Sequence, residues 1–479
     1  MITKHKRDAC ASIRVSQIVA LSITMINQPD HNIETKQPYS RIQTPSMNRY
    51  SILALILFVA ACEKPEEKKS KILTEGTPES GGFSSARLAR LDSNMSKWVT
   101  QKWINGAAAL IARNGKIVYY KSSGFSDLDT KTPLAKDGIF RIASQTKAIT
   151  SVAVMMLWEE GKFSLKDPVF KFIPSFANQQ VLDKFNAKDT THTTIPAKRP
   201  ITILDLLTHT SGISYPIIGT AEATAIYAKS NIPGGLGVKD QKLSDAMTRL
   251  GTLPLMYQPG EKWMYGLNTD LLGYLVEIWS GMTLEDFFYE RIFQPLGMAD
   301  TYFNVPQEKA SRLVNFFRED STGINKQEKA FDGELDMNYP IQKHEYFSGG
   351  GGLSSTLYDY AVFLQMLLNE GEYNGVRILS HNTVRMMTTN QIGDLNLGED
   401  KFGLGFAIVS ENSSRLTPSQ AGTYSWGGVF STSYWVDPKE KMVVLFYRQM
   451  WGPKVGDTDQ AFKPLVYQAI NDFVTDLQP

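Results

Sequence analysis

Residues 138–147 read Gly138-Ile139-Phe140-Arg141-Ile142-Ala143-Ser144-Gln145-Thr146-Lys147 and contain the only Ser-x-x-Lys motif of the chain. Apolar residues precede the serine, and a mainly apolar run, Ala148–Trp158, follows the lysine as in a buried helix. Side chains three residues apart on a helix share a face, with Cβ atoms about 5–6 Å apart. We therefore expect Ser144 in the first helical turn, with the amine of Lys147 within hydrogen-bonding distance of its hydroxyl.

This pair of residue types suits covalent acyl transfer. A serine hydroxyl is a poor nucleophile until a neighbouring base accepts its proton. A lysine acts as that base where burial or a nearby cation lowers its pKa, and the apolar run after the motif is compatible with burial. The first turn also presents unpaired backbone N–H groups that stabilise negative charge. A chance motif on a solvated helix face is the alternative interpretation.

Two segments further along the chain favour the catalytic interpretation. Residues 258–273 form a Pro-Gly turn that leads through Tyr265 into an amphipathic helix. Residues 423–430 read as a strand that carries the pair Gly427-Gly428. Paired glycines weaken a strand and mark the close approach of a backbone or a ligand. The order along the chain is therefore serine and lysine, then tyrosine, then a glycine-bearing strand.

In this order the chain resembles the serine β-lactamase-like superfamily, which includes penicillin-binding proteins. Within it, the sequence is most similar to class C β-lactamases and the related esterases and D-aminopeptidases. Four further stretches resemble recurring segments of that family: Leu206–Ile213, Pro295–Met298, Gly349–Thr356 and Phe402–Phe406. The likeness extends from about Gly76 to Asp476. It implies an α+β fold with an antiparallel sheet that is built from both ends of the chain and packs against helices. A helical region is inserted in the sequence between the two sheet-forming segments.

The resemblance also implies roles for the matching residues. Ser144 matches the nucleophile, Lys147 its proton partner, and Tyr265 the tyrosine that activates the serine and protonates the leaving group. The backbone N–H groups of Ser144 and Val429 are implied to form the oxyanion hole. The implied substrate-binding residues are Trp426, Gly427, Gly428 and Asn268.

Two departures from class C β-lactamases favour an ester substrate. The tyrosine motif of those enzymes is Tyr-x-Asn, whereas Leu267 fills its third position here and Asn268 follows one residue later. Trp426 replaces the lysine of their Lys-Thr-Gly motif, which attracts a substrate carboxylate. A tryptophan offers an apolar wall and one N–H donor but no charge. We therefore predict a carboxylesterase for small acyl esters, with weak lactam turnover at most.

Other functions stay open at this point. The same machinery suits a β-lactamase or a D-amino-acid peptidase, either a DD-carboxypeptidase or a D-aminopeptidase, that acts on lactams or cell-wall peptides. A non-catalytic binding module of the cell envelope is the second alternative, although the presence of Ser144, Lys147 and Tyr265 argues against it. The 50 Lys and Arg residues balance 49 Asp and Glu residues, which gives no indication of nucleic-acid binding. Six histidines and two cysteines show no zinc-ligand cluster, so neither a metal nor a cofactor is implied.

Two conspicuous motifs have structural interpretations. His209 lies close to Ser211 in the sequence, yet no Ser-His-Asp order is evident, and we expect His209 to be structural. The run Gly349–Gly352 lacks the Gly-Lys-Ser/Thr ending of a phosphate-binding loop. We expect it to form a turn that enters a helix over Leu357–Leu368.

The N-terminal part predicts export and a lipid anchor. From Met47, a basic stretch, the apolar run Ile52–Phe58 and small residues up to Cys62 resemble a bacterial lipoprotein signal, in which the cysteine carries the lipid. A plain signal peptide or a small transmembrane anchor is the alternative. We predict a lipoprotein of the cell envelope that faces the periplasm or the cell surface.

This signal divides the chain into four parts. We predict a mis-assigned or non-structural extension over 1–46 and a signal peptide over 47–61. A flexible charged tether over 62–75 then precedes the hydrolase domain at 76–479.

Local patterns predict the main elements of that domain. Asn114-Gly115 between apolar runs indicates a β-hairpin of Ala107–Arg113 and Lys116–Tyr120. Helices are expected over Ser84–Thr100 and through most of 144–302, with polar loops at 178–199 and 230–237. The C-terminal part is expected to contain the strands Gly405–Val409, Thr423–Phe430, Ser433–Val436 and Met442–Arg448 and a closing helix, Ala461–Phe473.

Overall fold

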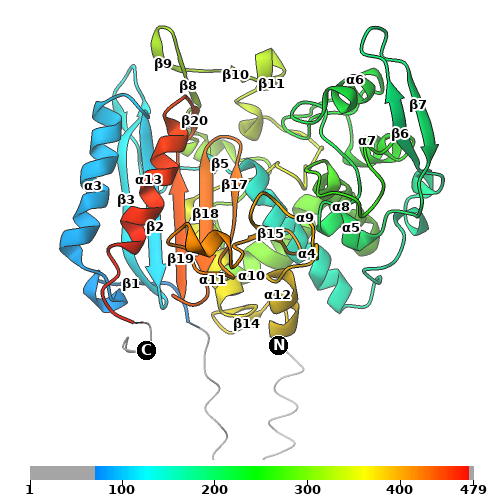
Figure 1. Cartoon of the computed structure of the whole chain (residues 1–479). Coiled ribbons are helices and arrows are strands. Elements are labelled where there is room, and N and C mark those ends of the chain that lie inside the picture. Colours follow the sequence, from blue (N-terminus) through cyan, green and yellow to red (C-terminus); the bar gives the residue numbers. More distant parts are fainter. Residues whose placement is uncertain (1–70, 474–479) are drawn as a thin grey trace, which may run out of the picture. The chain divides into compact units, whose positions relative to one another are not determined.

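The computed structural model describes residues 71–473, all of which belong to one compact unit, Lys68–Pro479 (Figure 1). The predictions for residues 1–61, including the signal peptide, lie outside the described residues, as does Cys62. The main sheet consists of β1 (Thr74–Glu75), β2 (Gly106–Arg113), β3 (Lys116–Asp127), β4 (Thr132–Pro133), β15 (Lys401–Phe402), β16 (Ala407–Ile408), β17 (Tyr424–Gly428), β18 (Thr432–Asp437) and β19 (Met442–Tyr447).

The strand order of this sheet is β1-β3-β2-β19-β18-β17-β16-β15, with β4 paired to β3. Neighbouring strands are antiparallel except β1 and β3, which are parallel. At the centre β2 pairs with β19, and Met442 lies opposite Arg113. The sheet is therefore built from both ends of the described chain, as predicted. Because β1 pairs with β3, Thr74 and Glu75 already belong to the sheet, just before the expected domain start at 76.

The hairpin of β2 and β3 turns at Asn114 and Gly115. Both residues have positive φ, 53° and 79°, which a two-residue type I′ turn requires and which Asn-Gly tolerates best. Every residue of β2 is buried, and successive side chains alternate between the two sheet faces. The predicted hairpin is confirmed, and its first strand lies at the heart of the fold.

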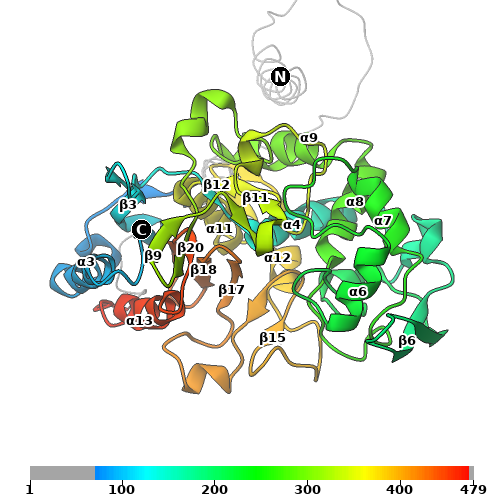
Figure 2. The same ribbon diagram turned by 90° about the horizontal axis from the view of Figure 1, so that it is seen from above.

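Helices cover both faces of the sheet. The helices α3 (Ser85–Thr100) and α13 (Val455–Tyr467) cover one face, where Phe462 stacks on Phe446 of β19 with ring centroids 4.0 Å apart. They lie together at one side of the molecule in Figure 2. On the other face lie α11 (Leu357–Leu368), whose bounds match the prediction, and α4 (Thr146–Glu159).

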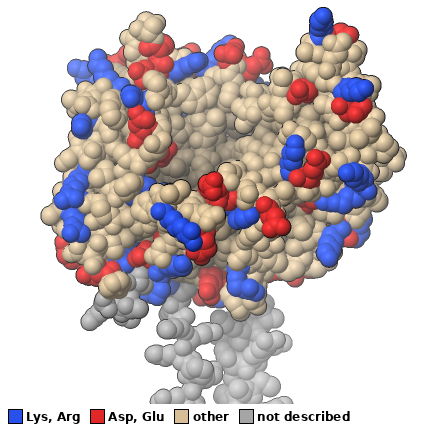
Figure 3. Space-filling model, viewed as in Figure 1, with Lys and Arg blue, Asp and Glu red and all other residues tan. Residues whose placement is uncertain are grey.

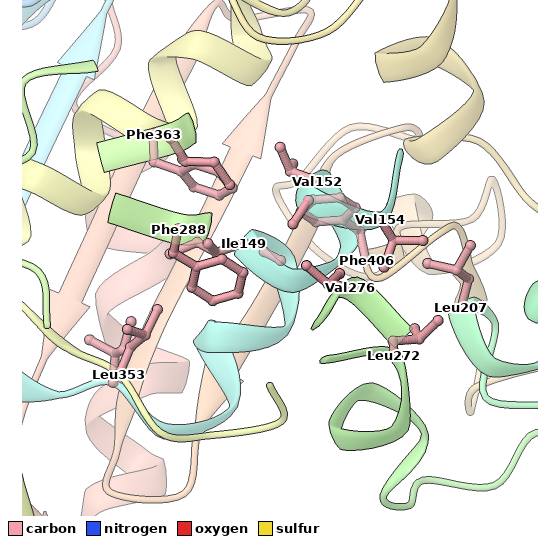
Figure 4. Packing of buried hydrophobic residues seen from close by; sticks show 14 of the residues in the cluster. Ile149, Val152, Val154, Leu207, Leu272, Val276, Phe288, Leu353, Phe363 and Phe406 are labelled. Atoms are coloured by element: carbon pink, nitrogen blue, oxygen red, sulfur yellow. The ribbon is translucent and has the colours of Figure 1, made fainter. Parts of the chain in front are cut away.

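The helical region lies between the two sheet-forming segments of the sequence. It contains α5 (Ile203–Leu207), α6 (Ala221–Lys229), α7 (Leu243–Leu250), α8 (Asn268–Ser280), α9 (Leu284–Phe288) and α10 (Gln294–Leu296), and α12 (His381–Met387) follows later in the chain. Side chains of α4, α8 and α11, among them Ile149, Val276 and Phe363, gather in one large apolar core (Figure 4). Burial of such side chains stabilises the fold by about 1.5–3 kcal/mol each. No helix among residues 71–473 is long and apolar enough to cross a membrane.

Two expectations were wrong in detail. The polar segment 178–199 is not a loop but contains a hairpin of β6 (Gln180–Phe185) and β7 (His192–Pro196), most of whose side chains are exposed. The closing helix ends at Tyr467, six residues earlier than expected, because Ile470 forms a β-bridge with Phe83 instead.

A short strand pair positions the functional region. The strand β5 (Phe140–Arg141), just before Ser144, pairs with β12 (Ser354–Ser355). This pairing brings the turn Gly349–Gly352 beside the start of α4, where Thr150 Oγ1 donates a hydrogen bond to Gly349 O over 2.7 Å.

Candidate active site

Ser144 lies in a 3-10 turn, Ala143–Gln145, that runs directly into α4. Within residues 138–157 it is the one residue that is not buried. Tyr360 and Tyr447 donate hydrogen bonds to the main-chain and side-chain oxygens of Gln145 over 2.8 and 2.5 Å. Ala143 has a φ of +44°, in the left-handed region that costs energy for a residue with a Cβ. A rigid buried frame therefore presents a single accessible hydroxyl.

Lys147 points its amine at that hydroxyl. Its residue exposure is 2%, and Nζ lies 3.3 Å from Ser144 Oγ. Nζ also donates to Tyr215 Oη at 2.9 Å and to Gly350 O at 2.6 Å. An ammonium group has three N–H donors, and here three oxygens surround it. Only the two hydroxyls among these can donate a proton to a neutral amine, so Ser144 and Tyr215 are its available proton partners.

Tyr265 approaches the lysine through its ring. Lys147 Nζ lies 4.6 Å from the centroid of this ring, the distance of a cation–π contact. The hydroxyl of Tyr265 accepts a hydrogen bond from Trp426 Nε1 at 3.4 Å. Within residues 71–473 no hydrogen bond joins this hydroxyl to Lys147. The structure thus brings together the three residues expected to be catalytic, with Tyr265 beside the amine rather than bonded to it.

Tyr215 is the site residue that sequence reasoning missed. Burial raises the pKa of its hydroxyl well above the ordinary value, and Tyr265 and Asp270 act in the same direction. The hydroxyl therefore stays protonated at neutral pH. Tyr215 follows the family-like segment Leu206–Ile213 by two residues, and that position is the only signal that could have pointed to it.

His209 has the structural role that was expected. Its Nδ1 accepts a hydrogen bond from Asn268 Nδ2 at 2.9 Å, and Asn268 Oδ1 accepts one from Ser211 Oγ at 2.5 Å. Burial, followed by the nearby charge of Lys147, lowers the pKa of His209 well below its ordinary value, so the ring is neutral. Asn268, which was expected to bind substrate, has no exposed surface and here connects His209 to Ser211.

The glycine-bearing strand ends against the residues before Ser144. A Cβ on Gly428 would lie 2.3 Å from Ile142 O, so only glycine permits this approach, as the glycine pair predicted. Within the described residues, the backbone N–H groups of Ser144 and Val429 donate to no acceptor. Both N–H groups expected to form the oxyanion hole are thus available to an oxygen of a ligand.

Aromatic side chains line the surroundings of Trp426. Its ring centroid lies 5.5 Å from those of Tyr265 and Phe402 and 6.4 Å from that of Trp263. Trp426, Gly427 and Gly428 are all partly exposed. Figure 3 shows the surface hollowed in its centre, and mainly uncharged residues line the hollow. Among residues 71–473 there is also no His, Cys, Asp or Glu cluster that could hold a metal ion.

Comparison with known proteins gives a consistent result. The family model described as Beta-lactamase matches residues 91–466. Esterase EstB of Burkholderia gladioli is 29% identical over 400 residues, which cover 78% of this chain and 95% of that protein. A putative D-alanyl-D-alanine carboxypeptidase of Escherichia coli K12 is 29% identical over 422 residues, covering 82% of this chain and 88% of that protein. The solved structure of EstCE1, a hydrolase with promiscuous acyltransferase activity, is similar with a TM-score of 0.68 and 25% identity, covering 81% of this chain and 99% of that one.

Proposed function

We propose that this protein hydrolyses small carboxylic esters. The chain belongs to the Beta-lactamase family and is a serine hydrolase of that fold, and the proposal proceeds from this. The observation that carries this proposal is the uncharged aromatic wall beside the nucleophile. Trp426 stands where a lactamase carries a lysine, and its N–H contacts the hydroxyl of Tyr265 at 3.4 Å. A neutral ester needs no cation for its recognition. The similarity to EstB supports the same conclusion.

The proposed reaction has two steps. Ser144 Oγ attacks the ester carbonyl and forms a C–O bond while its proton passes to Lys147 Nζ, 3.3 Å away. The N–H groups of Ser144 and Val429 stabilise the oxyanion of the tetrahedral intermediate. Collapse breaks the bond to the leaving alkoxide, which takes the proton back from Lys147 Nζ. Water then attacks the acyl-enzyme by the same route, releasing the acid and restoring Ser144.

A D-amino-acid peptidase is the second candidate. The Escherichia coli relative, a putative D-alanyl-D-alanine carboxypeptidase, favours it. Its substrate would end in a carboxylate, which a cation recognises best. Trp426 supplies no such charge, and this candidate therefore ranks below the esterase. A β-lactamase meets the same objection.

We also propose that the enzyme is a lipoprotein attached to a membrane of the cell envelope through Cys62. The sequence from Met47 to Cys62 supports this, because a basic start, a short apolar run and small residues precede the cysteine. The charged residues after Cys62 would hold the hydrolase domain away from the lipid surface.

The first test compares kcat/KM for p-nitrophenyl butyrate and for nitrocefin, a chromogenic lactam. We expect strong ester turnover and negligible lactam turnover. Ser144→Ala serves as the blank and should lose up to about 10⁶-fold in kcat, by analogy with other nucleophile deletions. Nitrocefin turnover near the ester rate would refute the esterase assignment in favour of a lactamase. An active S144A variant would remove Ser144 from the mechanism.

A further inference from the structure

A carboxyl group lies buried behind Lys147 and takes no part in the reaction described above. Asp270, in the first turn of α8, has a residue exposure of 1%. Its Oδ1 accepts a hydrogen bond from Ser348 Oγ at 2.6 Å. Burial raises the pKa of this carboxyl, while the charge of Lys147, the hydroxyl of Ser348 and the N–H of Gly350 act in the opposite direction. Burying a carboxyl group costs free energy of desolvation, and here the buried group lies near the catalytic amine.

Gly350 connects the two groups. Its carbonyl oxygen accepts the 2.6 Å hydrogen bond from Lys147 Nζ. A Cβ at this position would lie 2.2 Å from Asp270 Oδ2 and 3.2 Å from Tyr215 Oη. Asp270, Tyr215 and Lys147 therefore converge on one glycine that leaves no room for a side chain. Among the described residues Lys147 and Asp270 form no direct ion pair, and the backbone of Gly350 lies against both.

The charges around Lys147 leave Asp270 as its acidic partner. Besides Asp270, the titratable groups that face the amine are His209, Tyr215 and Tyr265. His209 is neutral because burial lowers its pKa, and tyrosine hydroxyls carry no charge near pH 7.

Apart from Lys147, the titratable groups that interact with Asp270 are two phenols that remain protonated. These are Tyr215 and Tyr346, and burial raises the pKa of both well above the ordinary value. The charge of Arg249 acts on the pKa of Tyr346 in the lowering direction, and the pKa still stays well above the ordinary value. Tyr346 Oη is buried and has no hydrogen-bond partner within residues 71–473. Because both phenols are uncharged, neither one adds a charge that offsets the carboxylate, and Lys147 is left to do so.

We propose that Asp270, across Gly350 from Lys147, is a positioning residue whose carboxylate is the counter-charge of the amine. By this charge it sets the pH range in which Ser144 is acylated. When Ser144 gives its proton to the amine, a positive charge forms inside a buried site. The carboxylate offsets that charge until the proton leaves with the alkoxide. This inference rests on the serine hydrolase chemistry and not on the choice of ester as substrate.

The test is the pH profile of Asp270→Asn, which removes the charge and keeps an acceptor for Ser348. Without its counter-charge the ammonium form is less stable, so the acidic limb of kcat/KM should move about one pH unit towards lower pH. We expect kcat to fall and KM to change little, because a residue with 1% exposure cannot touch the substrate. The rate at which a fluorophosphonate labels Ser144 should show the same shift, and this readout needs no ester or lactam substrate.

Tyr346→Phe is the matched control. It removes a buried hydroxyl from the same pocket and keeps the carboxylate, so the acidic limb should not move. A folded D270N variant with an unmoved limb in both assays would overturn the proposal, since Asp270 would then only fill space. If D270N does not fold, Asp270→Ser removes the same charge in a smaller volume and is judged by the same criterion. Failure of ester turnover combined with a shifted labelling profile would refute the esterase proposal alone.

Discussion

Trp426 gives the site its chemical character at the scale of a single residue. It lies in the middle of β17, and the rings of Trp263, Tyr265 and Phe402 lie around it. Its indole N–H donates to the hydroxyl of Tyr265 at 3.4 Å. The position therefore provides apolar contact area and holds Tyr265, whereas a lysine there would provide a charge for a substrate carboxylate.

Trp426→Lys should change which substrates the enzyme accepts. We expect kcat/KM for p-nitrophenyl butyrate to fall about tenfold or more, because the apolar wall and the N–H contact are lost. Nitrocefin turnover should rise about tenfold, since a cation then attracts its carboxylate. Steady-state kinetics on both substrates check this.

Trp426→Phe is the control for that change. It keeps the wall and removes only the N–H group, so ester turnover should stay within several-fold of the wild-type value. Unchanged kinetics in both variants would show that Trp426 does not face the substrate.

Among the predicted site residues, Ser144 and Lys147 had a local signal, whereas Tyr265 and Trp426 were predicted from the family resemblance. Ser144 and Lys147 lie three apart, so helix geometry alone brings them together. Tyr215 and Gly350 contact the lysine across long stretches of sequence, and Asp270 lies behind Gly350. The glycine run was visible in the sequence, but nothing in it indicated a contact with Lys147. Tyr215 is one of 20 tyrosines. Only the folded chain shows which of them touches the amine.

At the scale of elements, the site depends on the end of β17 resting against the turn that carries Ser144. Gly428 makes this contact, and Thr432 Oγ1 donates to the same oxygen, Ile142 O, at 3.4 Å. The next residue, Val429, is anchored from the other side because Trp451 Nε1 donates to its carbonyl oxygen at 2.6 Å. The strand end is thus fixed at both edges.

Gly428→Ala should separate these two elements. The new Cβ would overlap Ile142 O, and such overpacking costs about 1–3 kcal/mol of stability. Displacement of the Val429 N–H from Ser144 should reduce kcat about 10²-fold. Thermal melting and ester kinetics measure the two effects.

Gly427→Ala offers a comparison for stability. A Cβ there would meet only Thr432 O, at 3.2 Å, so its melting temperature should fall less than that of G428A. Equal melting temperatures for both variants would contradict the close packing of this strand end.

Elements with a strong turn or cap signal were predictable. Asn114-Gly115 gave the hairpin, and Thr356, which caps α11 by accepting from Asp359 N at 3.2 Å, matches the predicted helix start. The hairpin of β6 and β7 could not be recognised, because its strands are largely exposed and lack alternating hydrophobic residues. The first turn of α13 contains Gly456 and Asp457. Both residue types have low helix propensity, so the sequence did not indicate that the helix begins at Val455.

At the scale of the whole molecule, the proposed anchor predicts where the enzyme is found. The chain expressed from Met47 in a bacterium should incorporate labelled palmitate and sediment with the membranes, whereas Cys62→Ser should do neither. Ester hydrolysis should be the same in both, because Cys62 precedes the hydrolase domain. An unlabelled, unsedimented wild-type protein would refute the anchor.

The pairing of β2 with β19 has a consequence for how the protein is made. Synthesis proceeds from the N-terminus, so β2, with every residue destined for the interior, emerges long before its partner strand exists. Its edge stays open until Met442–Tyr447 leaves the ribosome, and an open apolar edge invites pairing with other chains. The nascent protein therefore depends on being held apart from its neighbours during translation, and any truncation that removes β19 leaves an aggregating fragment rather than a smaller enzyme.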